Sequence, residues 1–275
     1  MSVVPEEEAH PARSTGRVAA ASGTLEEPQV RAMFDRIARV YDAMNSVMTA
    51  GQHHRWRERA VDLAAVGPGS KLLDVATGTG DLAIEAARRI GPTGEVVGSD
   101  FSEEMLAGAR RKQIPVAVAF EWGNALDLSY EADRFDAATV GFGARNFADL
   151  DRGLREMTRV VRPGGRVVVL EITTPSRPPL STFYKAWFDR LVPLLGRFDE
   201  AYTYLPASVK RFPCPHELAA RMHAVGLDPV RYVLTAGGII AIHVGEKPGT
   251  ANDAGAAHHD GAAFEDPAAD LEGSD

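Results

Sequence analysis

Two glycines separated by one residue, Gly78 and Gly80, follow a short apolar segment and stand where a helical pattern begins. Glycine lets the backbone turn tightly and lie close to a ligand, because no Cβ stands in the way. Asp100 ends a second apolar segment about 20 residues further on. A carboxylate at this spacing can accept hydrogen bonds from both hydroxyls of a ribose. The sequence therefore predicts a site for an adenosine-containing cofactor.

The glycine pattern alone fits more than one such cofactor. Gly78, Gly80 and Ala83 also satisfy the fingerprint of dinucleotide-binding proteins. The chain has no Tyr-x-x-x-Lys pair of the kind that short-chain dehydrogenases use for proton transfer. Asp74 and Asp81 flank the loop, and their carboxylates are expected to repel a pyrophosphate and to attract the ammonium and sulfonium groups of S-adenosylmethionine. Asp81 alone has a second interpretation, as an acid that the macrodipole favours at a helix N-terminus. The combined pattern favours S-adenosylmethionine.

Strand-like and helix-like patterns alternate along the chain. Strands are expected over residues 71–76, 95–99, 116–122, 135–142 and 166–172. Helices are expected over residues 81–90, after Ser102 as an N-cap, and over about 149–161. A nearly continuous apolar segment such as 167–170 is typical of a central strand in a parallel sheet that is covered on both faces. This order predicts an α/β fold with a doubly wound, mostly parallel sheet.

Segments outside this alternation complete the predicted fold. Residues 229–234 and 239–244 are expected to form two strands joined by a short Gly-Gly link, so the sheet should end in an antiparallel hairpin. Before the first strand, apolar residues in 30–49 recur mostly every three or four positions. That spacing predicts an amphipathic helical region, an N-terminal lid. A further apolar helical segment is expected over 180–195.

Composition divides the chain into one domain, over residues 28–247, and two acidic tails, 1–27 and 248–275, which are expected to be disordered. The domain holds 26 acidic and 28 basic residues, so the net charge of −8 comes from the tails. The near-neutral charge of the domain argues neither for nor against contact with nucleic acid or membrane. No nucleic-acid partner is expected. Cys214 is the single cysteine, which excludes an internal disulfide and fits a cytoplasmic protein.

Motifs along the domain resemble one family. They are MFDRIA at 33–38, YDAMN at 41–45, RWR at 55–57, FGARN at 142–146, LREM at 154–157, RPGG at 162–165, YTYLPAS at 202–208 and LTAGG at 234–238. With the glycine loop they resemble the class I S-adenosylmethionine-dependent methyltransferases, and more narrowly the C-methyltransferases of menaquinone and ubiquinone biosynthesis. A general methyltransferase would share the loop and the Pro-Gly-Gly turn but has little reason to carry the other motifs.

The resemblance implies a Rossmann-like fold and a set of cofactor-binding residues, which are Thr77, Gly78, Gly80, Asp100, Asn124 and Ala125. Thr77 occupies the loop position that touches the methionine part of the cofactor. Asp100 matches the carboxylate that binds the ribose. Asn124 and Ala125 match the pair that lies against the adenine. One position departs from the family pattern, because Gly141 stands where members often have serine.

The resemblance also implies the acceptor, a ring carbon of a demethylated quinone with a polyprenyl tail. Because a carbon of the oxidised ring is electrophilic, the reduced quinol is expected to be the substrate. Demethylmenaquinol is the preferred acceptor, and a ubiquinone precursor or another lipophilic metabolite is the alternative. A member that binds the cofactor without catalysis is an alternative from a different class.

Arg145 and Asn146 are the predicted catalytic residues. They follow the fourth expected strand, at the sheet edge where open α/β folds bind ligands. We expect Arg145 to stabilise a developing phenolate and Asn146 to orient the hydroxyl or a water. Alternatively, Arg145 pairs with a neighbouring carboxylate. No metal site is expected, since His53 and His54 have no further ligands at a suitable spacing.

Apolar groups beyond the sheet are candidates for an acceptor pocket. The aromatic candidates are Phe34, Tyr41, Tyr184, Trp187, Tyr202, Tyr204 and Phe212, each with core packing as its alternative. The Arg55-Trp56-Arg57 cluster is expected either to contact anionic lipid headgroups or to lie on a helix surface with its charged ends in water. Peripheral contact with the inner face of the cell membrane is expected because the acceptor is lipophilic. A homodimer is a further expectation.

Overall fold

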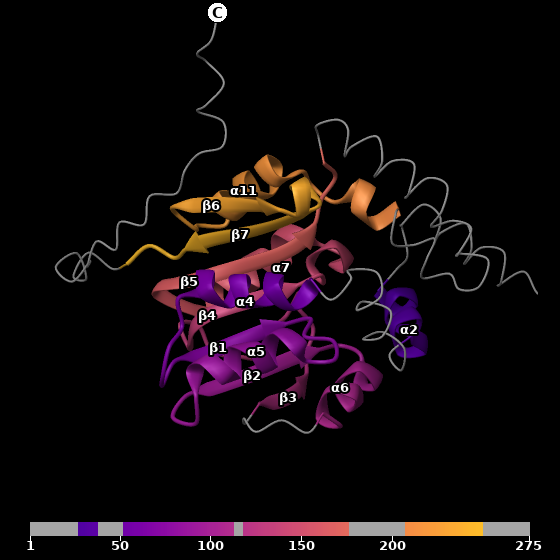
Figure 1. Ribbon diagram of the computed structural model, residues 1–275, viewed down its shortest axis with the longest axis vertical. Helices are drawn as coiled ribbons and strands as arrows, with labels where there is room; N and C mark the ends of the chain where they lie inside the picture. The colour runs from indigo at the N-terminus through magenta and orange to yellow at the C-terminus, as the bar shows by residue number, and fades with distance from the viewer. Residues whose placement is uncertain (1–26, 38–51, 113–117, 176–206, 250–275) are drawn as a thin grey trace, which may run out of the picture.

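The computed structural model describes residues 27–37, 52–112, 118–175 and 207–249. Within them, one sheet has the strand order β3-β2-β1-β4-β5-β7-β6 (Figure 1). Its strands are β1 (Lys71–Val75), β2 (Glu95–Asp100), β3 (Ala119–Trp122), β4 (Phe135–Gly141), β5 (Val161–Ile172), β6 (Val230–Thr235) and β7 (Ile240–Glu246). Residues 1–26 and 250–275, most of the 30–49 region and the 180–195 segment lie outside the described residues. The disorder of the tails and the domain limits therefore stay predictions, except that Glu27 is helical.

Strand pairing follows the predicted topology. β1 lies between β2 and β4 and is parallel to both. β3 extends the sheet in parallel beside β2, and β5 does so beside β4. β7 then runs antiparallel between β5 and β6. The prediction of a doubly wound, mostly parallel sheet that ends in an antiparallel hairpin is therefore confirmed.

Helices cover both faces of this sheet. The helices of the described residues are α2 (Glu27–Ile37), α4 (His53–Ala64), α5 (Asp81–Ile90), α6 (Glu103–Arg110), α7 (Leu150–Val160) and α11 (Pro215–Ala224), of which α2 packs on α6. On one face, α4 and α5 lie over the sheet (Figure 1). The core beneath them contains Leu72 and Leu82. On the other, α7 and α11 pack around Leu73 and Met157. Leu72 and Leu73 belong to different cores because successive side chains of a strand point to opposite faces.

Residues with a recognisable capping or turn role stand at the start of three of these helices. The hydroxyl oxygen of Ser102 accepts a hydrogen bond from the Met105 N–H, which confirms the predicted N-cap of α6. The Asp149 carboxylate accepts one from the Arg152 N–H and caps α7 in the same way. These bonds satisfy N–H groups that the first helical turn leaves without partners. Gly80 precedes α5 in a left-handed conformation with φ of 82°.

Two helices and one strand boundary differ from the sequence expectations. α4 and α11 were not predicted as elements; α4 mixes charged residues with only a narrow stripe of apolar ones. β5 was expected to begin at residue 166 but begins at Val161. The Pro-Gly-Gly turn therefore lies within the strand, where the pairing with β4 shifts register between Phe135 and Ala137. A shift of register lets a strand continue through a sequence that normally ends one.

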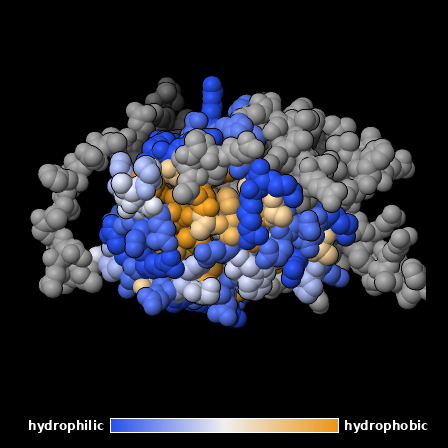
Figure 2. Space-filling view, turned by 90° about the horizontal axis from the view of Figure 1, so that it is seen from below, coloured by the Kyte–Doolittle hydropathy of each residue, from blue (hydrophilic) through white to orange (hydrophobic). Residues whose placement is uncertain are grey.

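β3 forms one edge of the sheet. Figure 2 shows the molecule from this side, where an apolar area lies between hydrophilic surroundings. Val118 and Phe120 are partly buried against the core under α4 and α5, whereas Trp122 exposes 53% of its surface. Among the described residues, no helix has both the length and the apolar character needed to cross a membrane.

His243 is a buried imidazole where β7 meets α11. Its Nε2 lies 2.9 Å from the carbonyl oxygen of Pro215 and therefore donates to it. Its ring lies beside Tyr232, with 5.1 Å between the ring centroids. Burial lowers the pKa of His243 from 6.5 to about 4, although the bond to Pro215 acts in the opposite direction. The imidazole is therefore neutral in the folded protein at neutral pH.

We expect His243 to reduce the stability of the fold as the pH falls from 6.5 towards 4. In this range the unfolded chain takes up a proton that the folded chain does not, so unfolding becomes more favourable by on the order of 3 kcal/mol. His243→Gln keeps a donor for Pro215 but cannot titrate. Urea unfolding of both proteins between pH 7.5 and 4 should show the wild type losing stability relative to the variant.

The comparison isolates one residue, because every other titrating group is common to the two proteins. Asp74 and Asp100, whose pKa values are raised, contribute with the opposite sign and cancel in the difference. A stability difference between wild type and variant that does not change with pH would contradict the buried, neutral His243.

Candidate active site

A cleft opens at the carboxyl ends of β1, β2 and β4, and it encloses about 910 Å³, part of it open to solvent. From β1 the chain crosses to β2 on one side, and β4 lies on the other, so this is the switch point where open α/β sheets bind ligands. Six of the predicted site residues line the cleft, namely Thr77, Gly78, Asp100, Asn124, Ala125 and Asn146. Gly80 and Arg145 do not belong to its lining.

The loop after β1 turns through left-handed backbone conformations. The φ angle is 51° at Ala76, 57° at Gly78 and 82° at Gly80. Glycine adopts this region without a steric cost, whereas a residue with a Cβ is strained there. The Thr77 N–H donates to the Ser99 carbonyl at 3.0 Å, and the Gly80 N–H donates to the Thr77 carbonyl at 2.9 Å. These bonds fix a tight turn directly above the ends of β1 and β2.

Asp74 joins three parts of the site. One carboxylate oxygen accepts a hydrogen bond from the Thr77 hydroxyl at 2.6 Å, and the other accepts one from the Thr139 hydroxyl at 2.7 Å. The carboxylate thus connects β1 with the glycine loop and with β4. Burial raises the pKa of Asp74 to about 6, although both hydrogen bonds favour the charged form.

Asp100 holds the glycine loop from the end of β2. One carboxylate oxygen accepts from the Gly78 N–H at 2.8 Å and the other from the Ser102 N–H at 2.9 Å. Burial raises the pKa of Asp100 to about 6 against the effect of these bonds. The Ser102 hydroxyl donates to Asp35 of α2 at 2.5 Å, so α2 is attached beside the cleft. Each carboxylate oxygen can accept a further donor, such as a ribose hydroxyl.

Asp81 does not carry an unpaired negative charge beside the loop. Arg57 places its Nη2 3.1 Å from one Asp81 oxygen, and the Lys112 ammonium pairs with the other. Burial tends to raise the pKa of Asp81, but the two cations outweigh it and hold the pKa below its usual value. The expectation that Asp81 repels a pyrophosphate assumed an unpaired charge, and the structure shows that this charge is paired. Its charge is compensated by cations whose approach depends on the fold.

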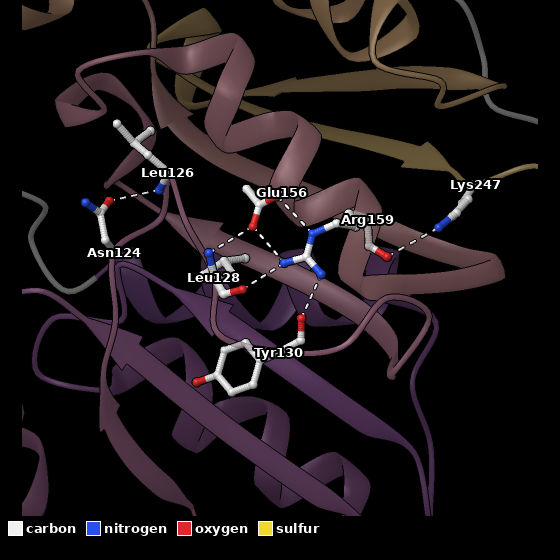
Figure 3. A network of polar contacts seen from close by, with 7 residues as sticks. All are labelled: Asn124, Leu126, Leu128, Tyr130, Glu156, Arg159 and Lys247. Carbon is white, nitrogen blue, oxygen red and sulfur yellow. Dashed lines mark hydrogen bonds and ion pairs between the residues drawn. The ribbon is translucent and has the colours of Figure 1, made fainter.

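Asn124 and Ala125 lie on the loop that leaves β3. The side-chain oxygen of Asn124 accepts a hydrogen bond from the Leu126 N–H at 2.9 Å, which closes a short turn (Figure 3). Both residues line the cleft on the side of β2 and β3, beside Asp100. This position is compatible with their contact with an adenine, which stays a prediction.

A polar network from α7 holds the continuation of this loop (Figure 3). The Arg159 guanidinium donates to the carbonyls of Leu128 and Tyr130 at 2.8 and 2.7 Å. Glu156 pairs with Arg159 and accepts a hydrogen bond from the Leu128 N–H at 2.9 Å. Lys247 donates to carbonyls at the end of α7, including that of Arg159. The loop beside the cleft is thus fixed to a helix on the sheet face.

Arg145 and Asn146 follow β4 in one short helical turn but have different surroundings. The Arg145 guanidinium lies 2.7 Å from a Glu171 oxygen and also donates to the Phe142 carbonyl, and both charged side chains are buried. This ion pair is the alternative that the sequence left open for Arg145. Asn146 lines the cleft, and its buried side-chain oxygen has no hydrogen-bond partner among the described residues. Such an acceptor is suited to a donor from a ligand.

Arg57 belongs to the site, although the sequence did not lead us to predict this role. It is 7% exposed and lines the cleft, so it is neither a surface residue with its charge in water nor a lipid contact. Its spacing from Ala60, Val61 and Ala64, which are buried on the same helix, was the available signal. Trp56 lies edge-on to Phe142, with 6.4 Å between ring centroids.

The aromatic candidates for an acceptor pocket are only partly within the described residues. Phe212 is partly buried against the core, which supports its alternative role in packing. The others, and the side chain of Phe34, lie outside what the structure describes. Gly141 lines the cleft, and a Cβ there would lie 3.0 Å from the end of the Leu82 side chain. In place of a side chain at 141, Leu82 occupies this part of the wall.

A sequence model of the ubiE/COQ5 methyltransferase family matches residues 23–247. The chain belongs to this family. Its relatives include a demethylmenaquinone methyltransferase of Thermus thermophilus, 46% identical over 78% of this chain and 100% of that protein. A ubiquinone/menaquinone biosynthesis C-methyltransferase of Pseudomonas aeruginosa is 39% identical over 80% of this chain and 89% of the relative.

Solved structures support the fold of this ubiE/COQ5 family member. A chain from the complex between the Haloferax volcanii Trm112 methyltransferase activator and a methyltransferase superposes with a TM-score of 0.58, at 17% identity, over 78% of this chain and 97% of that one. An S-adenosylmethionine-dependent methyltransferase of Thermotoga maritima gives 0.56 at 19% identity, over 78% and 99%. At this identity the likeness concerns the fold alone.

Family membership identifies S-adenosylmethionine as the cofactor of this methyltransferase. The residues of the cleft fit it. Asp100 offers buried carboxylate oxygens suited to ribose hydroxyls, and the glycines of the loop let a ligand approach the backbone closely.

Substitution of Gly80 should mainly lower the stability of the fold, whereas substitution of Gly78 should mainly lower the affinity for the ligand. A Cβ on Gly80 would lie 2.6 Å from the Phe120 ring, whereas a Cβ on Gly78 would meet nothing within 4 Å. We expect Gly80→Ala to lower the free energy of unfolding by about 2–4 kcal/mol, from overpacking and positive φ together. Gly78→Ala should cost about 1 kcal/mol but weaken S-adenosylhomocysteine binding, because Gly78 lines the cleft and its Cβ would occupy open space.

Urea unfolding and isothermal titration calorimetry measure the two effects separately. Each variant is the control for the other, since both introduce a methyl group at a left-handed position of one loop. Equal losses of stability, or unchanged ligand affinity in Gly78→Ala, would contradict this division between packing and binding.

Proposed function

We propose that the protein transfers a methyl group from S-adenosylmethionine to a ring carbon of a prenylated quinol, and that demethylmenaquinol is its acceptor. The observation that supports this acceptor most is the 46% identity to the Thermus thermophilus demethylmenaquinone methyltransferase over the whole of that protein. The relatives named for ubiquinone as well as menaquinone biosynthesis keep a ubiquinone precursor as the alternative acceptor.

The chemistry requires a nucleophilic ring carbon, which the reduced quinol provides and the oxidised quinone does not. S-adenosylmethionine supplies an electrophilic methyl group when it is bound. The protein must hold the acceptor carbon within roughly 3 Å of that methyl group, in line with the bond that breaks. Loss of a proton from a phenolic hydroxyl increases the electron density on the neighbouring carbon, so a residue that binds this hydroxyl aids the reaction.

Asn146 is the residue that we assign to this hydroxyl. Its side-chain oxygen is a buried acceptor in the cleft wall, and a phenolic O–H is a suitable donor. Arg145 shares its charge with Glu171, so its effect on a phenolate is reduced by a neighbouring negative charge. In this proposal Arg145 positions Asn146, because its bonds to Glu171 and to the Phe142 carbonyl fix the turn on which both residues stand.

The location follows from the acceptor in the same proposal. A prenylated quinol resides in the membrane, so a cytoplasmic enzyme must meet it at the inner face. The homodimer stays a prediction.

Methyl transfer to defined quinols tests the function. The full-length protein is incubated with methyl-labelled S-adenosylmethionine and either reduced demethylmenaquinone or a reduced, demethylated ubiquinone precursor in detergent. We expect label in menaquinone, and much less when the quinone is not reduced. A family member of known activity serves as the positive control. Absence of label from both quinols would overturn the proposal, and label in the ubiquinone precursor alone would establish the alternative acceptor.

Two single variants test the roles of Asn146 and Arg145. We expect Asn146→Ala to lower kcat about 10²-fold or more while the affinity for S-adenosylhomocysteine stays within about threefold, because only the acceptor side loses a contact. Arg145→Ala should lower kcat and also the melting temperature, since it leaves Glu171 buried without its partner. Normal turnover in Asn146→Ala would remove that residue from the mechanism, and an unchanged melting temperature in Arg145→Ala would contradict the positioning role.

A further inference from the structure

Arg57 brings a positive charge into the wall of the cleft at a site that the catalytic proposal does not use. A buried guanidinium is stable only with partners of suitable charge or hydrogen-bonding capacity. Its Nη2 lies 3.1 Å from Asp81, and its Nη1 lies 3.2 Å from Nδ1 of His53. A guanidinium has five N–H donors. The contacts within the described part of the chain engage two of its nitrogens, so donors remain for a ligand.

Charged side chains of both signs stand around the glycine loop. Asp81 pairs with both Arg57 and Lys112, and of these two cations Arg57 lines the cleft. Asp74 lies on the other side of the loop and lines the same cleft. A wall of this kind is complementary to a group that carries one carboxylate and one ammonium. It has no excess of positive charge for a pyrophosphate.

The topology assigns opposite ends of the cleft to the two ends of an extended ligand. Asp100 and Asn124 stand at the ends of β2 and β3, on the side predicted for the adenosine part. α4 packs on α5 and β5, on the other side of β1 (Figure 1). Arg57 belongs to this helix and lines the cleft. A ligand with its ribose at Asp100 therefore directs its amino-acid end towards Arg57 and Asp81.

We propose that Arg57 binds the carboxylate of the methionine part of S-adenosylmethionine. Two N–H groups of the guanidinium match the two oxygens of a carboxylate, a geometry that a lysine ammonium cannot reproduce. Asp81 acts as a positioning residue, because its bond to Nη2 holds the guanidinium at the cleft wall. The inference deepens the proposed function only on the cofactor side and does not depend on which quinol is the acceptor.

The test compares ligands with and without the carboxylate. Isothermal titration calorimetry measures the affinity of S-adenosylhomocysteine, of its decarboxylated amine analogue and of 5′-methylthioadenosine, which lacks the whole amino-acid end. In the wild type, loss of the carboxylate should lower the affinity at least tenfold. Arg57→Gln should lower the affinity for S-adenosylhomocysteine at least tenfold and that for 5′-methylthioadenosine less than twofold. Arg57→Lys should fall between wild type and Arg57→Gln.

Arg59→Gln is the matched control, because Arg59 is exposed on the same helix, two residues away. It should bind all three ligands as the wild type does. Equal weakening of all ligands by Arg57→Gln would indicate a purely structural role and overturn the proposal. Unchanged S-adenosylhomocysteine affinity with a raised KM for the quinol would assign Arg57 to the acceptor instead, and would also overturn it.

If Arg57→Gln does not fold, the decarboxylated ligand on the wild type and on Arg57→Lys still decides the question. A wild type that binds the acid and the decarboxylated amine equally well refutes carboxylate recognition. Because no acceptor is present in these titrations, their outcome is independent of the quinol assays. A failed methyl transfer and a failed carboxylate contact are therefore distinguishable.

Discussion

The buried carboxylate of Asp74 is the constraint on which the site depends. A carboxylate with 1% exposure must receive hydrogen bonds, and it receives them from Thr77 in the glycine loop and Thr139 in β4. The two hydroxyls can reach it only if the loop folds back over β1 and β4 lies beside β1. The left-handed turn after β1 and the β1–β4 pairing that creates the switch point therefore stabilise each other.

The other charged groups of the cleft are arranged around the same loop. Asp100 holds the loop amide of Gly78 from the β2 side, and Asp81 begins α5 on the other. Three carboxylates around one loop would repel each other if all were unpaired. Arg57 and Lys112 approach from α4 and from the residues after α6 and compensate Asp81. α4 therefore does more than cover the sheet, because it brings one of the cations that compensate Asp81 beside the loop.

The sequence predicts well what depends on near neighbours along the chain. The glycine loop, the Ser102 cap and the alternation of strands and helices are all encoded within about ten residues. The partners in contacts between distant segments were not identified, although pairing of Arg145 with a carboxylate was an open alternative. Arg57 meets Asp81 across 24 residues and Arg145 meets Glu171 across 26, and neither carboxylate stands at a spacing that marks a pair. The sequence interpretation treated Asp81 as an unpaired negative charge that repels a pyrophosphate. It therefore reached the correct cofactor through an argument that the ion pairs of Asp81 do not support.

The neighbouring residues Arg145 and Asn146 show why adjacency in a motif does not imply a shared role. In a turn of three residues per helical repeat, consecutive side chains point in directions about 120° apart. Arg145 is directed to Glu171 on β5, and Asn146 is directed to the cleft. A buried arginine needs its carboxylate, and the resulting bonds fix the backbone on which the next residue stands. The motif thus combines an anchor with a residue that can meet the ligand, and the rigidity of the first defines the position of the second.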